Sequence, residues 1–389
     1  MRKYNIISGD GHLEVPPETW TKYAPAKYQD IAPKTVKLPD GTEVGRVLDS
    51  EMSCDVVLAC DLDYDQYGRG RSSSWHYPDG SPRPGTGDAI QRLQEQDRDG
   101  IDAEILYPAV GASRFLRPLL AKDPEAYLAL VKAYNTWLGE EYCPVAPDRL
   151  LGNAVVPETG LEDAILEAER CRDMGIRSMC LTNWPNGGAW YAPGDEKFFE
   201  AMVDLEMVNS PHSNFGASGP KPGTESDKQT IAISKLHSRT GGSAAYAISQ
   251  LIYHIFDKVP KSMVYIGESF CSWIPFNMNR SNEYYVRYQM REDDLHLKKL
   301  PSEYYRDNMK FSFIHERSAM EMRYLIGVDL LIWGSDFPHT ANTFPHSVAS
   351  VDEMFRDVPE DERRQVLVLT PCELFGLDPD KEITPTPSR

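Results

Sequence analysis

Short runs of β-branched and aromatic residues recur along the chain, separated by segments whose apolar positions have helical spacing. Eight runs predict strands: Tyr4–Ser8, Ala103–Tyr107, Leu151–Val156, Ile176–Leu181, Glu206–Ser210, Met263–Glu268, Lys310–Ile314 and Leu330–Ser335. Strands that alternate with helices form parallel sheets, because a crossover between parallel strands usually contains a helix. Eight of them favour a closed (β/α)8 barrel, the TIM barrel, over an open doubly wound sheet.

The segments between the strands contain helices with recognisable ends. Asp123-Pro124-Glu125 supplies an N-cap, a proline at the first helical position and an acid in the first turn of a helix that runs through Trp137. Helical spacing predicts three more helices, over Asp88–Asp99, Leu161–Met174 and Glu360–Leu369. These helices fall between predicted strands, as a barrel requires.

Three stretches do not fit the regular alternation. Glycine and proline are frequent in residues 38–87, and glycine, serine and proline in residues 214–230. Aromatic and charged residues are frequent in residues 277–309. Long excursions from a compact domain are usually lids or binding loops. We therefore predict a single α/β barrel domain over residues 1–378 with three lid-like insertions, followed by a frayed C-terminal tail over residues 379–389.

Composition and charge narrow the class of protein. A hydrophobic fraction of 41% with 26% charged residues is typical of a folded chain. The formal net charge of −18 argues against nucleic acid or an anionic membrane surface as a partner. No apolar run approaches the roughly 18 residues of a membrane span, and the first residues lack a signal-peptide core. We therefore expect a cytoplasmic protein that acts on a small molecule.

Ligand-type side chains follow several of the predicted strands, at the end of a barrel where active sites lie. The first strand leads into Asp10-Gly11-His12-Leu13-Glu14, whose alternate side chains point the same way while the chain is extended. A mixture of histidines and carboxylates suits Fe, Mn or Zn. The sequence thus predicts a metal centre with six candidate ligands: Asp10, His12, Glu14, His212, Glu268 and Asp336.

Each candidate ligand also has an ordinary structural explanation. A single histidine at a strand end, such as His212, is more often structural than a ligand, and Asp336 before Phe337-Pro338 fits an Asx turn. Glu268 fits a buried partner of an arginine. Their coincidence at four separate strand ends favours the metal centre, because random placement would scatter them. The chain has no GxSxG or HExxH motif, so a serine nucleophile elbow and a zincin helix are not expected.

Three motifs resemble the amidohydrolase 2 branch of the amidohydrolase superfamily, which includes aminocarboxymuconate semialdehyde decarboxylase. They are ISGDGHLEVPPETW over Ile7–Trp20, DRDGIDAEILYP over Asp97–Pro108 and WGSDFPH over Trp333–His339. The resemblance covers nearly the whole chain, apart from most of residues 40–87 and 277–309. It implies the barrel fold and a metal-dependent activity.

The resemblance also implies a role for each ligand, with departures. The first-strand His-x-His of the family falls on Asp10-x-His12, its strand-6 histidine falls on or near Glu268, and its last-strand aspartate falls on Asp336. The strand-5 histidine falls on His212. These departures make the centre more anionic than the mononuclear zinc site of the decarboxylases. Four carboxylates suit two divalent ions, with Fe or Mn favoured and Zn as the alternative, bridged by Glu14 or Glu268.

A binuclear centre would activate water for hydrolysis, with Asp336 taking the proton and His339 or His346 orienting the substrate. The pattern also resembles the di-iron thioesterases of platensimycin and platencin biosynthesis, which implies hydrolysis of a bulky acyl-CoA thioester. The alternative is a nonoxidative decarboxylase of an aromatic or unsaturated carboxylic acid, for which a single ion suffices. A non-catalytic binding protein on the same fold is the second alternative. Barrels of this family often pair, which leaves a homodimer open.

Overall fold

The structure is a computed structural model of the chain. It describes residues 2–53, 56–57, 71–72, 74–108, 112–212, 215–216, 221–223, 243–288, 296–339 and 341–388. Parts of the three predicted insertions therefore lie outside the described residues, namely 54–55, 58–70 and 73 in the first, most of the second and 289–295 in the third.

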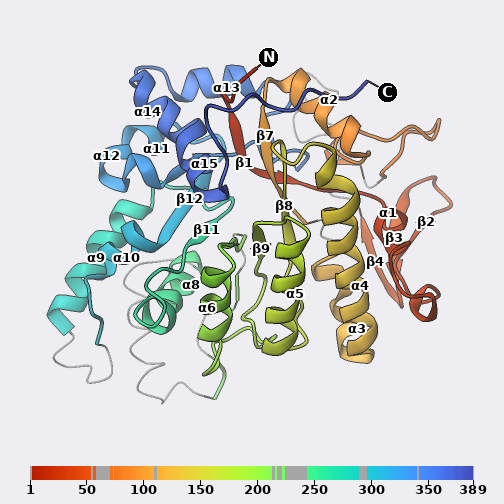
Figure 1. The fold of residues 1–389 in the computed structure, drawn as a ribbon, viewed down its shortest axis with the longest axis horizontal. Coiled ribbons are helices and arrows are strands. Elements are labelled where there is room, and N and C mark those ends of the chain that lie inside the picture. Colours follow the sequence, from red (N-terminus) through yellow and green to blue (C-terminus); the bar gives the residue numbers. More distant parts are fainter. Residues whose placement is uncertain are drawn as a thin grey trace.

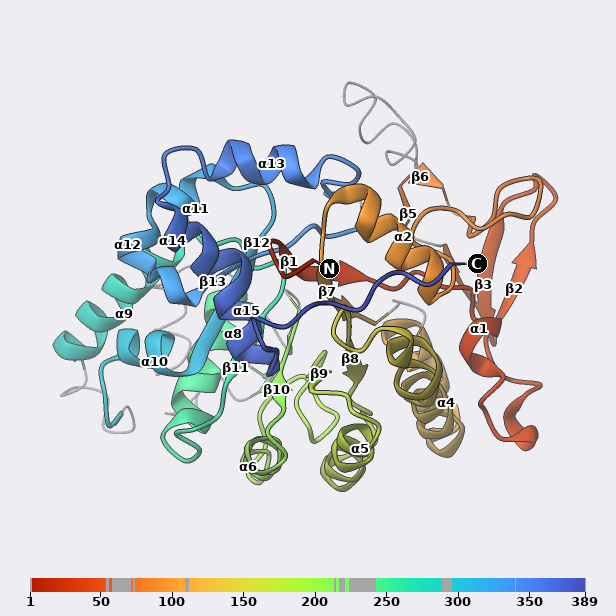
Figure 2. The same ribbon diagram turned by 45° about the horizontal axis from the view of Figure 1, so that its top comes forward.

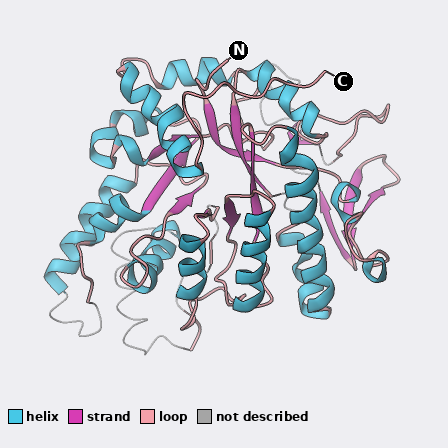
Figure 3. Ribbon diagram, in the orientation of Figure 1, coloured by secondary structure: helices cyan, strands magenta, loops and turns pink. Residues whose placement is uncertain are grey.

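Eight parallel strands surround the centre of the molecule, with helices outside them (Figures 1 and 3). They are β1 (Ile7–His12), β7 (Ala103–Tyr107), β8 (Leu150–Val155), β9 (Ser178–Cys180), β10 (Val208–Asn209), β11 (Val264–Ile266), β12 (Met309–Phe313) and β13 (Leu331–Trp333), paired in that order. The two edges of this sheet meet because the His12 amide donates to the Phe337 carbonyl at 2.7 Å and the Asp336 amide to the Asp10 carbonyl at 2.8 Å. The predicted (β/α)8 barrel is confirmed.

The first strand is the one whose bounds differ most from the prediction. β1 begins at Ile7 and runs to His12, whereas the apolar pattern predicted Tyr4–Ser8. All six residues of β1 are buried although Asp10 and His12 are polar. The predicted strand ends too early because the last residues of β1 include polar side chains, which do not continue the apolar run.

The helices confirm the capping signals. The Asp123 carboxylate accepts from the Ala126 amide at 3.0 Å, and that of Asp88 accepts from the Gln91 amide at 2.8 Å. Figure 2 shows the helices around the barrel from a second direction. They are α1 (Glu18–Thr21), α2 (Ala89–Asp99), α3 (Arg117–Lys122), α4 (Pro124–Trp137), α5 (Leu161–Asp173), α6 (Glu196–Asp204), α8 (Ser243–Leu251), α9 (Ile274–Tyr288), α10 (Pro301–Asn308), α11 (Arg317–Glu321), α12 (Arg323–Ile326), α13 (Ser347–Met354), α14 (Glu360–Arg364) and α15 (Thr370–Phe375).

The described parts of the first and third insertions contain strands and helices. Within and just before residues 38–87, an antiparallel sheet forms from β2 (Lys34–Lys37), β3 (Glu43–Val47) and β4 (Ser50–Ser53), and the buried Trp75 packs beside it. Residues 277–309 differ from the lid that we expected, because they supply most of α9 and all of α10 between β11 and β12. Four of their tyrosines are buried, namely Tyr284, Tyr285, Tyr304 and Tyr305, so the mixed composition reflects amphipathic barrel helices.

The C-terminal tail is not frayed, contrary to the sequence-based expectation. It runs beside the start of the chain (Figures 1 and 2), where the Ile383 amide donates to the Arg2 carbonyl at 3.0 Å. The Thr384 amide donates to Asp148, and the Thr386 hydroxyl accepts from the buried Arg149 at 2.9 Å. The tail therefore supplies partners for polar groups at the amino-terminal end of the barrel. Across the part of the chain that is described, no helix is long and apolar enough to cross a membrane.

Asp99, at the end of α2, joins this helix to the start of α13. Its two carboxylate oxygens accept from the amide and the hydroxyl of Ser347, at 2.9 and 2.6 Å. Burial raises the pKa of Asp99 from 3.8 to about 6, although the Ser347 hydrogen bonds act in the opposite direction. The protonated carboxyl therefore stabilises the fold below pH 3.8, and this stabilisation is lost as pH rises through about 6.

We expect Asp99→Asn to stabilise the protein at pH 8 and to flatten the decline in stability between pH 4 and 6. The pKa shift corresponds to about 3 kcal/mol, and the loss of one acceptor costs about 1 kcal/mol, which leaves a net gain of about 2 kcal/mol. Urea unfolding at pH 4, 6 and 8 measures the effect. The exposed Asp380→Asn variant is the control. An Asp99→Asn variant that is less stable than wild type at pH 8 would contradict the assignment.

Candidate metal centre

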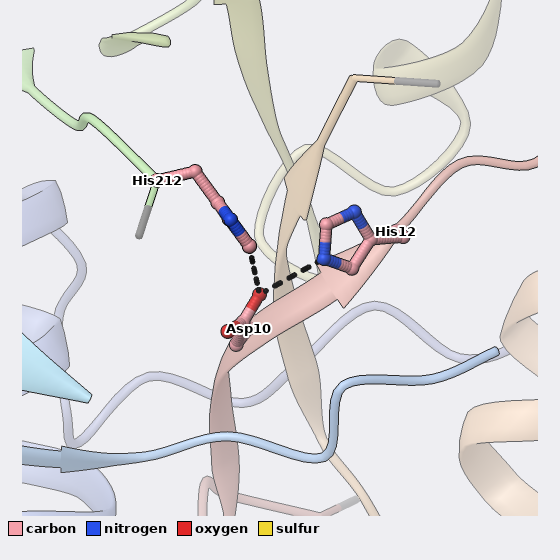
Figure 4. Close-up of side chains that lie close together, drawn as sticks. All are labelled: Asp10, His12 and His212. Carbon is pink, nitrogen blue, oxygen red and sulfur yellow. Dashed lines mark ion pairs between the residues drawn. The ribbon is translucent and has the colours of Figure 1, made fainter. Parts of the chain in front are cut away.

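Three predicted ligands converge at the carboxyl ends of the strands. Asp10 and His12 project from the end of β1 towards His212, which follows β10 (Figure 4). Asp10 Oδ1 lies 3.4 Å from His12 Nε2 and 3.8 Å from His212 Nε2. Asp10 and His12 are two residues apart, so the alternation of an extended chain puts their side chains on the same side of the strand.

Asp336 reaches the same place from the other edge of the sheet. It follows β13, and its Oδ1 lies 3.4 Å from His12 Nε2. Its φ of 57° is in the left-handed region, which costs a non-glycine residue of order 1 kcal/mol and is common at functional sites. The same nitrogen of His12 thus lies near both carboxylates. Because that nitrogen has one lone pair, it can bind one ion only.

The buried polar atoms of this cluster fit a bound cation. Both carboxylate oxygens of Asp10, both ring nitrogens of His12 and Oδ1 of Asp336 have no hydrogen-bond partner among the described residues. Leaving such atoms unpaired costs about 1–3 kcal/mol each, so a ligand is expected where they gather. Two groups of potential ligands have all their atoms within 4.8 Å of one another: Asp10, His12 and His212, and His12, Asp336 and His339. Nitrogen and oxygen donors suit Mn, Fe or Zn.

The charges of the cluster are also suited to a cation. Burial acts to raise the pKa of Asp10, but His12 and His212 outweigh it and hold this pKa below its usual range. Burial acts to lower the pKa of His339, but Asp336 and Glu14 outweigh it and raise this pKa well above its usual value. These pKa shifts favour an anionic Asp10 and protons on histidine. A divalent ion would displace these protons, as metal binding to histidine generally does.

Glu14 and His339 lie next to the cluster and pair with each other. His339 Nδ1 lies 3.4 Å from Asp336 Oδ1, and its Nε2 lies 3.4 Å from Glu14 Oε1. The His339 ring stacks on that of His12 with centroids 3.7 Å apart. The structure therefore places Glu14 behind His339, outside both ligand groups, whereas we predicted it as a ligand. The predicted catalytic residue His339 lies inside the cluster.

Glu268 lies at the rim of the cluster. Its Oε2 is 3.6 Å from His212 Nε2, and its side chain keeps 29% of its exposure. Burial raises the pKa of this carboxyl, with Asp336 and Asp10 acting in the same direction and His212 against them. Glu268 and Phe270 both have left-handed φ values, 46° and 52°. The Glu316 carboxylate accepts from the amides of Cys271 and Ser272, the next two residues of the turn. The strained turn thus holds Glu268 beside His212, outside the two groups.

The third predicted catalytic residue, His346, is not brought to this place. It caps the start of α13 and is exposed, and its amide donates to the Thr343 carbonyl at 2.7 Å. The sequence missed Tyr107, the last residue of β7, whose ring lies 5.6 Å from that of His12 and 4.8 Å from that of His212. Its hydroxyl is 2.7 Å from the Ser210 hydroxyl. The position of Tyr107 at a strand end could have indicated a place in the site, but an ordinary core tyrosine fits the same position equally well.

A comparison with protein families agrees with this fold. The model of the amidohydrolase family matches residues 76–377, which is more than half of the chain. The protein therefore belongs to the amidohydrolase family, in the branch whose motifs it resembles. Its superfamily consists of metal-dependent enzymes on this barrel. No curated protein matches the chain.

Solved structures share the whole fold. An amidohydrolase of Mycobacterium avium subsp. paratuberculosis K-10 is 16% identical, with a TM-score of 0.71 and coverage of 97% of this chain and 100% of its own. The 5-carboxyvanillate decarboxylase of Sphingomonas paucimobilis is 17% identical, with a TM-score of 0.62 and coverage of 96% and 99%. The dihydroxybenzoic acid decarboxylase of Polaromonas sp. JS666, which holds manganese and 2-nitroresorcinol, is 17% identical, with a TM-score of 0.60 and coverage of 96% and 97%. These structures lend no support to the predicted iron centre or thioesterase activity.

Proposed function

We propose that this protein is a metal-dependent, nonoxidative decarboxylase of an aromatic carboxylic acid. The observation that carries the proposal is the convergence of Asp10, His12, His212 and Asp336 on one place. Because His12 Nε2 lies 3.4 Å from both Asp10 and Asp336, the two potential ligand groups share one donor atom and suit a single ion. One ion is sufficient for decarboxylation, whereas the binuclear hydrolysis predicted from the sequence needs two.

Two similar structures support an aromatic carboxylic acid as the substrate. The Sphingomonas and Polaromonas enzymes are named as decarboxylases of substituted benzoic acids, and the second holds manganese. Manganese accepts the nitrogen and oxygen donors that gather here. We therefore propose a benzoic acid with an oxygen substituent on the ring as the substrate and Mn²⁺ as the first ion to test.

A divalent ion held by Asp10, His12, His212 and Asp336 would supply a Lewis acid that anchors the substrate carboxylate and a neighbouring oxygen. In the reaction the bond from the ring to the carboxylate carbon breaks, its electron pair stays on the ring carbon, and that carbon takes up a proton. We assign Asp336 to pass this proton on from a protonated His339, whose Nδ1 lies 3.4 Å from Asp336 Oδ1. Glu14, 3.4 Å from the other nitrogen of His339, holds the ring in place.

Metal content and product together test the proposal. We expect protein stripped by a chelator to be inactive, and one Mn²⁺ per chain to restore CO₂ release from a panel of hydroxylated and methoxylated benzoic acids. Atomic absorption counts the ions and a coupled assay measures CO₂. The same protein is incubated with aromatic and branched acyl-CoA esters, and free thiol is measured. Two ions per chain with thiol release and no CO₂ would overturn the proposal in favour of hydrolysis.

A further inference from the structure

A fully buried ion pair lies under the edge where the barrel closes. Arg92 on α2 keeps 2% of its exposure and Glu104 on β7 keeps 1%. Arg92 Nε donates to Glu104 Oε2 at 2.7 Å, and Arg92 Nη2 donates to Glu104 Oε1 at 3.2 Å, so the pairing is bidentate. A second donor, Gln96 Nε2, binds Glu104 Oε2 at 2.9 Å. Such a pair resists distortion because its geometry is planar and fixed on both sides.

The remaining donors of Arg92 bind the backbone of the two strand ends that hold metal ligands. Nη1 donates to the carbonyl of His12 at 3.2 Å, and Nη2 donates to the carbonyl of Phe337 at 3.1 Å. The guanidinium carbon also lies 4.5 Å from the centre of the Phe337 ring. One side chain therefore contacts ligand His12 and the residue next to ligand Asp336.

The sequence leaves room for this contact at Gly11, between Asp10 and His12. A Cβ atom there would lie 2.8 Å from Arg92 Nη2 and 3.0 Å from Glu104 Oε1. The carbonyl of Phe337 that accepts from Arg92 also accepts from the His12 amide at 2.7 Å. The ion pair thus occupies space that only glycine leaves open, directly beneath the two ligands of β1.

We propose that Arg92 is a positioning residue for the metal centre, fixing His12 of β1 and Asp336 beyond β13 at the separation that one ion requires. This inference rests on the proposed metal-dependent function. Glu104 neutralises Arg92 and fixes its orientation, so the pair acts as a unit. Residues that orient metal ligands without touching the ion typically change metal affinity by about 10–100-fold when they are replaced.

Mn²⁺ affinity of a lysine variant tests the proposal. Lysine keeps the charge but has one donor centre and cannot bind Glu104 and both carbonyls in the same fork. We expect Arg92→Lys to weaken Mn²⁺ binding about 10–100-fold by isothermal titration calorimetry, and to broaden the electron paramagnetic resonance spectrum of bound Mn²⁺. Arg149→Lys is the matched control, because Arg149 is equally buried, at 1% exposure, and precedes β8 at the opposite end of the barrel. Equal Mn²⁺ affinities of the two variants would overturn the proposal.

A second variant separates positioning from stability. Replacing both charges, in Arg92→Met with Glu104→Met, leaves no buried charge unpaired and often preserves stability. We expect this double variant to melt near the wild-type temperature while it still binds Mn²⁺ about 10–100-fold more weakly. Wild-type affinity in a folded double variant would show that Arg92 does not position the ligands. If the wild-type protein itself bound no Mn²⁺, the proposed function would fail independently of Arg92.

Discussion

Asp336→Asn is expected to lower the rate of CO₂ release by about 10²–10⁴-fold, the usual contribution of a proton-transferring group. Asp336 Oδ1 lies 3.4 Å from His12 Nε2 and 3.4 Å from His339 Nδ1, and the proposed function makes this residue both a metal ligand and the group that passes the proton to the ring. The amide of asparagine has nearly the same shape but carries no negative charge and no acidic proton. Initial rates at saturating Mn²⁺ and substrate measure kcat.

Saturating Mn²⁺ matters in this experiment because it separates the two roles of Asp336. If only metal binding were lost, excess Mn²⁺ would restore kcat. Asp329→Asn is the control, since Asp329 precedes β13 whereas Asp336 follows it, and the Asp329 side chain is 66% exposed at the far end of the strand. A full wild-type kcat in Asp336→Asn would exclude Asp336 as the proton donor.

His12→Ala is expected to weaken Mn²⁺ binding by at least about 100-fold, more than replacing a residue that only orients a ligand. His12 is the donor that the two potential ligand groups have in common, and its ring is 4% exposed. Removing it leaves two carboxylates close together without the nitrogen between them. Calorimetric titration with Mn²⁺ measures the loss, and circular dichroism checks that the variant is folded.

The control for His12→Ala is His346→Ala. The sequence predicted a catalytic role for His346, but the structure places it exposed at the start of α13. We expect this variant to bind Mn²⁺ as the wild type does and to keep its kcat within about twofold, as for surface substitutions away from a site. Weak Mn²⁺ binding by His346→Ala together with tight binding by His12→Ala would show that the centre lies elsewhere.

Strand ends made most of the candidate centre predictable from the sequence. Asp10, His12, His212 and Asp336 were expected together because parallel strands of a barrel bring their carboxyl ends to one face. Glu14 was grouped with Asp10 and His12 on the assumption that the chain stays extended. β1 ends at His12, so the alternation that aligns Asp10 with His12 does not extend to Glu14.

The residues that sequence reasoning missed depend on tertiary packing. Arg92 lies in a helix with the spacing of an ordinary amphipathic segment, and nothing local distinguishes it from an exposed arginine. Its burial arises because Gly11, far away in the sequence, leaves space for the guanidinium. The amphipathic character of α9 and α10 was hidden in the same way, because their aromatic residues suggested a binding loop until the barrel showed which face is buried.

The closure of the barrel between β1 and β13 has a consequence for biosynthesis. Asp10 and His12 leave the ribosome long before Asp336, because most of the barrel lies between them in the sequence. Contacts between such distant parts of a chain form late, because closing a long loop is entropically costly. The nascent chain therefore presents only part of the ligand set. Metal loading would follow the synthesis of Asp336 and its packing against β1, so cation supply would act on a closed barrel and not on the first strands as they emerge.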